Sequence, residues 1–177
     1  ILAEHKPPVF DNAAGIRLLV SRQRRPSADV LDQDIHSCNQ LTSILAKMEA
    51  TAAGADDAIL LDPAGMVAET SSTHVFVVRG GTVVTPTTRA CPEGITRAVV
   101  LALCGRSGIV VEQRDIPRDE LATIDEAFVT GTMGEITPVA AIDDRRLEPV
   151  PGGVTARIAT ACRAGTRDPA EGTQLVP

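Results

Sequence analysis

The sequence predicts a mixed α/β fold in which helices and β-hairpins alternate along one domain. Three observations support this prediction. The 177 residues are enough for one domain with a substantial core. The composition, 44% hydrophobic and 23% charged, is typical of soluble globular proteins. Segments with helical periodicity alternate with short apolar runs bounded by turns, which favours a mixed rather than a purely parallel sheet.

The first half of the chain is expected to hold a linker, a strand, a helix and two hairpins. Residues 1–14 have the mixed polarity and prolines of a linker, and residues 16–21 predict a strand that leads into an arginine-rich loop. The stretch "LDQDIHSCNQLTSILAKMEA" (Leu31–Ala50) begins like a buried strand and continues as an amphipathic helix. The two hairpins are predicted at residues 58–70 and 74–84.

The second half predicts further helices and strands, closed by a helix and a polar tail. The expected elements are a helix at 93–108, a strand at 109–116, a short helix after Pro117, a strand, glycine loop and strand at 126–143, and a helix at 154–165. The apolar stripe of the 93–108 helix consists of Ile95, Val99, Ala102 and Leu103. We therefore expect one domain over residues 15–165, followed by a frayed tail at 166–177.

Charge and cysteine content exclude several classes of protein. The net charge of −6 argues against nucleic-acid binding, and the cluster of Arg22, Arg24 and Arg25 is more simply explained as a solvated loop. The longest uninterrupted apolar run, residues 98–104, is too short to cross a membrane. The four cysteines form no C-x-x-C pair, which disfavours a zinc site or a redox dithiol and favours reduced thiols in a cytoplasmic protein. The chain begins at Ile1 without an initiator Met, so we expect it to be a piece of something longer.

Two loops could bind an anion. The segment "PEGITRAVV" places Gly94, Ile95 and Thr96 at a helix N-terminus, where free backbone N–H groups and the helix dipole attract phosphate. The loop "VTGTMGE" places Gly131 and Thr132 at the end of a strand, where small residues allow a ligand to approach the backbone. A common helix cap and a simple turn explain these segments equally well, and neither matches a nucleotide-binding motif.

Glu69 and His36 are the candidate titratable groups. Glu69 follows an apolar stretch, so if it is buried it must find a cation or a donor; alternation along the strand also allows it to face solvent. A hydrolase triad of Asp34, His36 and Ser37 fails, because neighbouring residues of a strand point to opposite faces. His5, His36 and His74 show no metal-ligand spacing, so we expect no metal site. A lone histidine such as His36 is more often a hydrogen-bonded core residue than a catalyst.

The order of four motifs resembles that of fold-type IV pyridoxal-phosphate enzymes, the family of branched-chain and D-amino acid aminotransferases and aminodeoxychorismate lyases. The motifs are "DIHSCNQLTSILAKMEA", "AILLDPAGMVAETSSTHVFVV", "GITR" and "DEAFVTGTMGEITPV". The resemblance runs from about Gly15 to about Ala164 and implies a mixed, partly barrel-like sheet flanked by helices, the large cofactor-binding domain of the family. It further implies that residues 1–14 are the interdomain linker and that the family's small N-terminal domain is absent.

The resemblance also implies roles for individual residues. Glu69 matches the glutamate that faces the pyridine nitrogen of pyridoxal 5'-phosphate and keeps it protonated. Gly94, Ile95 and Thr96 match the phosphate-binding helix start. Thr132 matches a second phosphate donor, and with the Met133 amide it resembles a site for the substrate carboxylate. The implied reaction transfers an amino group between an α-amino acid and a 2-oxo acid in a homodimeric enzyme.

His36 departs from the family, because it occupies the position of the Schiff-base lysine. An imidazole can shuttle a proton near neutral pH, but it cannot replace the covalent function of an amine. Three alternatives follow: an aminotransferase with an altered catalytic position, an inactive cofactor-binding or structural homologue, and a lyase of the same fold or an unrelated hydrolase that uses His36.

Overall fold

The computed structural model describes residues 4, 7–33, 35 and 38–168. The elements are β1 (Ile16–Arg24), α1 (Leu41–Ala52), β2 (Asp57–Leu61), β3 (Val67–Thr70), β4 (His74–Arg79), β5 (Thr82–Thr85), η1 (Thr88–Ala90), α2 (Ile95–Arg106), β6 (Val111–Gln113), η2 (Arg118–Ala122), β7 (Glu126–Gly131), β8 (Glu135–Ile142), β9 (Arg145–Arg146) and α3 (Gly153–Gly165). The fold is mixed α/β, as the sequence predicts.

The strands of the described chain form one mixed sheet in the order β3-β2-β1-β8-β7-β4-β5-β6, with β9 paired to β8. The two predicted hairpins are present as β2–β3 and β4–β5, and the two strands predicted at 126–143 also pair antiparallel, as β7–β8. Three other pairs are parallel: β1 with β2, β1 with β8, and β5 with β6. Strand β1 therefore joins the β2–β3 hairpin to β8, which is distant from both in sequence.

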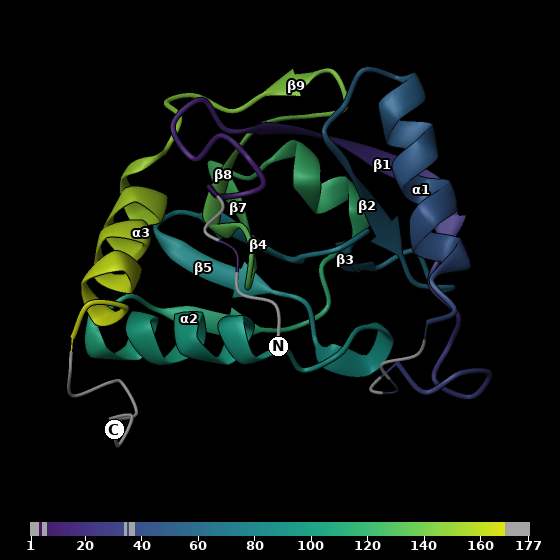
Figure 1. Ribbon diagram of the computed structural model, residues 1–177, viewed down its shortest axis with the longest axis horizontal. Coiled ribbons are helices and arrows are strands. Elements are labelled where there is room, and N and C mark those ends of the chain that lie inside the picture. Colours follow the sequence, from purple (N-terminus) through teal and green to yellow (C-terminus); the bar gives the residue numbers. More distant parts are fainter. Residues whose placement is uncertain (1–3, 5–6, 34, 36–37, 169–177) are drawn as a thin grey trace.

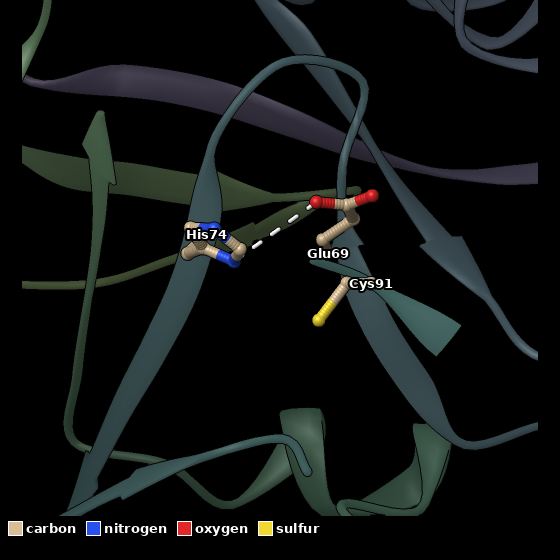
Figure 2. Close-up of side chains that lie close together, drawn as sticks. All are labelled: Glu69, His74 and Cys91. Atoms are coloured by element: carbon tan, nitrogen blue, oxygen red, sulfur yellow. Dashed lines mark ion pairs between the residues drawn. The ribbon is translucent and has the colours of Figure 1, made fainter. Parts of the chain in front are cut away.

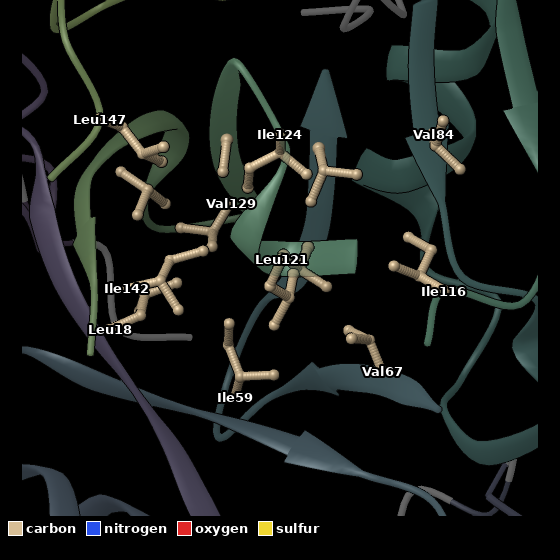
Figure 3. Close-up of a cluster of buried hydrophobic side chains, with 14 of the residues drawn as sticks. Leu18, Ile59, Val67, Val84, Ile116, Leu121, Ile124, Val129, Ile142 and Leu147 are labelled. Atoms are coloured by element: carbon tan, nitrogen blue, oxygen red, sulfur yellow. The ribbon is translucent and has the colours of Figure 1, made fainter. Parts of the chain in front are cut away.

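The sheet curls around the larger of its hydrophobic cores. This core combines side chains from most strands with Leu121 of the short helix η2 and Ile124, which follows that helix (Figure 3). A second core lies between β4, β5, β7 and β8 on one side and α2 and α3 on the other. There Phe76 and Phe128, paired across β4 and β7, stack with ring centroids 4.8 Å apart. The aliphatic cores agree with the scarcity of aromatic residues.

Helices cover the outside of the curled sheet. Figure 1 shows α1 against β1 and β2, with α2 and α3 side by side at the other end of the sheet. Two small side chains of α1, Ala46 and Ala50, are fully buried against Ala58 and Leu60 of β2. Small residues let the helix backbone approach the strand closely. None of the described helices combines the length and apolarity needed to span a membrane.

The structure corrects the expected orientation of two helices. The apolar residues that predict α1 lie on its outer face, with Leu41, Ile44, Leu45 and Met48 between 40% and 63% exposed. In α2 the buried side chains include Val100 and Cys104, whereas Ile95 and Val99 of the expected stripe are exposed. Ala102 is exposed as well, so Leu103 is the one buried member of that stripe. Helical spacing identified both helices, but packing against the sheet selected a different face.

Three expected boundaries are also wrong. The beginning of the Leu31–Ala50 stretch forms no strand in its described residues, and Leu31 and Ile35 are exposed. The first strand extends through Arg24 into the expected arginine-rich loop, where it pairs with Leu61 of β2. The expected strand at 109–116 is shortened to β6.

In the linker, the Val9 amide donates to the Met133 carbonyl, which ties this segment to the β7–β8 loop.

Candidate functional site

A cavity of about 510 Å³ opens beside the edge of the curled sheet. Four parts of the chain line it: ten residues between 25 and 43, Glu69 with residues 71–74 around the β3–β4 turn, residues 92–96 at the start of α2, and residues 130–132 at the end of β7. Tertiary folding thus gathers the ends of several strands and the N-terminus of one helix around a single space.

Most of the predicted site residues line this cavity. Glu69, Gly94, Ile95, Thr96 and Thr132 all contribute to its wall. Met133 is not among the lining residues, and its side chain is 63% exposed.

The predicted catalytic position, His36, lies outside the described residues. The nearest described residues on either side of it that line the cavity are Ile35 and Asn39.

Glu69 is a buried carboxylate with a cationic partner. Its residue is 6% exposed, and its Oε1 atom forms an ion pair with Nη2 of Arg25. Burial, opposed by the charge of Arg25 and helped by that of Asp57, raises the pKa of Glu69 to about 7. The alternative that Glu69 faces solvent is therefore wrong, and the expected cation is Arg25, which belongs to the cluster that the sequence analysis assigned to a solvated loop.

His74 faces Glu69 from the next strand. Its Nδ1 atom lies 4.0 Å from Oε2 of Glu69, and its side chain is 13% exposed. Burial lowers the pKa of His74 to about 4, with help from the positive charges of Arg97 and Arg25. The imidazole is therefore neutral at neutral pH.

Buried polar atoms without a hydrogen-bond partner gather at the cavity. Among the described residues these atoms are Arg25 Nε, Ser43 Oγ, Glu69 Oε1, Thr130 Oγ1 and Thr155 Oγ1. All except Thr155 belong to residues that line the cavity, and Glu69 Oε1 has only its ion pair with Arg25. Since buried polar groups in proteins are normally hydrogen-bonded, this wall has the properties of a binding surface for a polar ligand.

The N-terminus of α2 forms one wall of the cavity. The first-turn amides of an α-helix have no intrahelical acceptor, and Ile95 and Thr96 occupy this turn beside the cavity. Gly94 precedes the helix with φ +70°, a conformation that favours glycine. Arg97, 4% exposed, fixes the helix start by donating to the Pro86 carbonyl at 2.9 Å and to Gln113 Oε1 at 3.0 Å.

The sequence comparison identifies the family to which this site belongs. Residues 1–142 match the family model for amino-transferase class IV. The chain belongs to the class IV aminotransferase family. This membership confirms the resemblance that the four motifs indicate.

The region that matches this chain makes up about a third to a half of the relatives' own length. The chain is 46% identical over 162 residues to branched-chain-amino-acid aminotransferase-like protein 2 of Arabidopsis thaliana, which is 91% of this chain and 29% of that protein. It is 42% identical over 140 residues to a putative branched-chain-amino-acid aminotransferase of Methanocaldococcus jannaschii, which is 78% of this chain and 48% of that protein.

Solved structures of class IV aminotransferases share the fold. The PLP form of a branched-chain amino acid aminotransferase from Thermobaculum terrenum superposes with a TM-score of 0.84 at 36% identity and covers 89% of this chain and 53% of that one. An aminotransferase from Brucella abortus bound to PLP gives a TM-score of 0.83 at 31% identity, covering 91% of this chain and 57% of that one. The chain thus spans about half the length of these structures.

Sequence reasoning missed several residues of the cavity wall. Arg25 lies 44 positions before Glu69, and the two meet because β2 pairs with β1 on one side and with β3 on the other. Ser43 and Thr130 carry no motif signal, since hydroxyl residues are common on helices and strands. Arg97 lies within "GITR", but only the structure shows that it is buried. No local pattern could have identified these residues.

Proposed function

We propose that this chain is the cofactor-binding part of a pyridoxal 5'-phosphate-dependent aminotransferase that acts on an α-amino acid and a 2-oxo acid. The observation that carries this proposal is the buried Glu69 carboxylate, which lines a cavity whose wall also includes a helix N-terminus. The family match and the PLP in the Thermobaculum terrenum and Brucella abortus structures support the same cofactor class.

The residues present fit this cofactor. The pyridoxal ring carries a basic nitrogen at one end and a phosphate on a short arm. The cavity offers a carboxylate at Glu69 for the nitrogen. For the phosphate it offers the α2 N-terminus and the hydroxyls of Thr96 and Thr132. The unpaired hydroxyls of Ser43 and Thr130 provide further donors to a polar ligand.

The roles of the chain's own groups follow from this arrangement. When bound, the cofactor supplies an electron sink for a carbanion on the substrate. Glu69 accepts a hydrogen bond from the ring nitrogen and so holds a proton there, while Arg25 supports the charged form of the carboxylate. The amides of Ile95 and Thr96 hold the phosphate. A neutral imidazole at position 36 can move a proton, but it provides no amine for covalent attachment.

A second candidate function is cofactor binding without turnover. The observation that favours it is His36, which stands where the family has a lysine. The cavity wall is the same in both cases, so the two functions differ only in the chemistry at position 36. A homodimeric state and a cytoplasmic location remain predictions from the family resemblance.

Binding and covalent attachment can be tested separately. We expect pyridoxal 5'-phosphate to bind the native chain reversibly, with at least tenfold weaker binding in Glu69→Gln and unchanged binding in Glu112→Gln, which alters an exposed carboxylate of β6. After borohydride reduction, intact-mass measurement should show cofactor attached to His36→Lys but not to the native chain. Absence of binding in both proteins would contradict the proposal.

Activity distinguishes the two candidate functions. Amino transfer from branched-chain amino acids to 2-oxoglutarate, measured for the native chain and for His36→Lys, would support the aminotransferase if the native chain shows turnover. Turnover in His36→Lys alone, or in neither protein despite cofactor binding, would support the binding protein.

A further inference from the structure

Three side chains with metal-ligating atoms converge beside the cavity. Glu69 comes from β3, His74 from β4 and Cys91 from the segment after η1, and their ligand atoms all lie within 4.8 Å of one another. Figure 2 shows the Glu69 carboxylate and the His74 ring turned toward each other, with the Cys91 sulfur projecting into the same space. Local spacing in the sequence predicts no metal site, because these three ligands come from separate segments of the chain.

The ligand types suit zinc. Carboxylate oxygen, imidazole nitrogen and thiolate sulfur are its common ligands, at about 2.0–2.3 Å from the ion, so neighbouring ligand atoms lie roughly 3.3–3.8 Å apart in a tetrahedral site. Glu69 Oε2 and His74 Nδ1 are 4.0 Å apart, which leaves a side-chain adjustment on the order of 1 Å. A carboxylate and a thiolate together balance the charge of a divalent cation.

The orientation of the His74 ring also favours metal binding. Nε2 of His74 lies toward Gly94, which leaves Nδ1 as the nitrogen that faces Glu69.

Two arginines lie near the three ligands. Arg25 pairs with Oε1 of Glu69 and so leaves Oε2 facing His74. Arg97 donates to the Pro86 carbonyl and to Gln113 Oε1, and its charge also acts on His74 and Cys91. Their positive charges reduce the affinity for a cation, and the two anionic ligands oppose this effect.

We propose that Glu69, His74 and Cys91 form a zinc-binding site in the cofactor-free chain. Glu69 and His74 line the cavity, so the ion enters from there, and a water molecule from the cavity completes the coordination. The ion binds the Glu69 carboxylate, which the proposed function assigns to the ring nitrogen of the cofactor, so the ion and the cofactor compete for it. This consequence alone rests on the proposed function. The metal site itself can be tested without any cofactor.

Cobalt is a spectroscopic probe of this site. Titration of the cofactor-free chain with Co²⁺ should produce the visible bands of a tetrahedral site and a near-ultraviolet thiolate-to-cobalt charge-transfer band, and Zn²⁺ should remove both. In Cys91→Ser the charge-transfer band should be lost, and in His74→Ala and Glu69→Gln the affinity should fall at least tenfold. Circular dichroism of each variant shows whether it is folded.

Cys38→Ser is the matched control, because Cys38 is exposed and lies close in sequence to position 36. This variant should keep the full cobalt spectrum. Loss of the charge-transfer band in Cys38→Ser, its persistence in folded Cys91→Ser, or the absence of saturable Co²⁺ binding to the native chain would overturn the proposal. As an independent measurement, Zn²⁺ should raise the Tm of the native chain and of Cys38→Ala, but not that of Cys91→Ala.

Discussion

The imidazole of His74 occupies the space that a side chain at position 94 would need. A Cβ atom added to Gly94 would overlap Nε2 and Cδ2 of His74. Gly94 also has φ +70°, so two independent constraints act on this residue. The start of α2 and the β4 side of the cavity are thereby held in contact. This contact fixes the distance between the N-terminus of α2 and His74, which faces Glu69.

Gly94→Ala should destabilise the protein more than a glycine replacement with the same backbone strain. Gly65 is the matched control, with φ +83° and open space around its Cβ position. We expect Gly65→Ala to lower the free energy of unfolding by about 1 kcal/mol and Gly94→Ala to lower it by about 2–4 kcal/mol, because overpacking adds to the strain. Urea denaturation measures both values. In a His74→Ala background, the cost of Gly94→Ala should fall to that of the control, and an unchanged cost would contradict the contact.

The sequence predicted the elements of this fold better than their packing. The hairpins were predictable because each joins neighbouring segments through a short turn, as Asp62 and Gly65 do between β2 and β3. The central position of β1 was not, since it depends on parallel pairing with β2 and β8. Helical spacing likewise indicated α1 but not its buried face, because Ala46 and Ala50 allow a closer approach to β2 than the larger residues would.

The candidate site shows the same division. The order of the motifs along the chain predicted that Glu69, Thr96 and Thr132 share one site, and all three line one cavity. The partner of Glu69 could not be predicted, because Arg25 sits in a cluster whose other members are exposed. Physical contact between residues from different strands is a property of the tertiary fold and leaves no local pattern.

Removal of Arg25 should leave a buried carboxylate without its counter-charge. Both side chains of the pair are largely buried, at 13% exposure for Arg25 and 7% for Glu69. We expect Arg25→Met to lower the free energy of unfolding by about 1–3 kcal/mol at neutral pH, because Glu69, with a pKa of about 7, takes up a proton when its counter-charge is removed. Glu69→Gln in the same chain should restore most of this loss, because the neutral amide needs no cation. A double-mutant cycle from denaturant unfolding measures the coupling. Equal and additive losses would show that the ion pair does not stabilise the fold. Arg24→Met, which changes an exposed arginine of the same cluster, is the matched control and should have little effect.

Glu126 of β7 should stabilise the N-terminus of α3. Its carboxylate accepts hydrogen bonds from the amides of Val154 at 3.0 Å and Thr155 at 2.8 Å, so it serves as the cap that the helix's own N-cap residue, Gly152, cannot provide. We expect Glu126→Ala to lower the free energy of unfolding by about 1–2 kcal/mol. Glu126→Gln keeps an acceptor and should lose less. Thermal unfolding of the two variants checks the order, and a larger loss in Glu126→Gln would contradict the cap.

Glu120 should make the stability of the fold depend on pH in the acid range. Its carboxylate accepts two hydrogen bonds from Arg114, at 2.8 and 2.6 Å, and this pairing lowers the pKa of Glu120 below its ordinary value of 4.5. A carboxyl group whose pKa is lower in the folded state adds stability above the pKa of the unfolded state, and this contribution is lost as the pH falls through the folded value. The native chain should therefore lose stability below pH 4.5 more steeply than Glu120→Gln does, as measured by urea unfolding across the acid range. In an Arg114→Met background the two slopes should coincide, because the main cause of the lowered pKa is gone; a difference that persists there would assign the lowered pKa of Glu120 to another partner, such as Arg79.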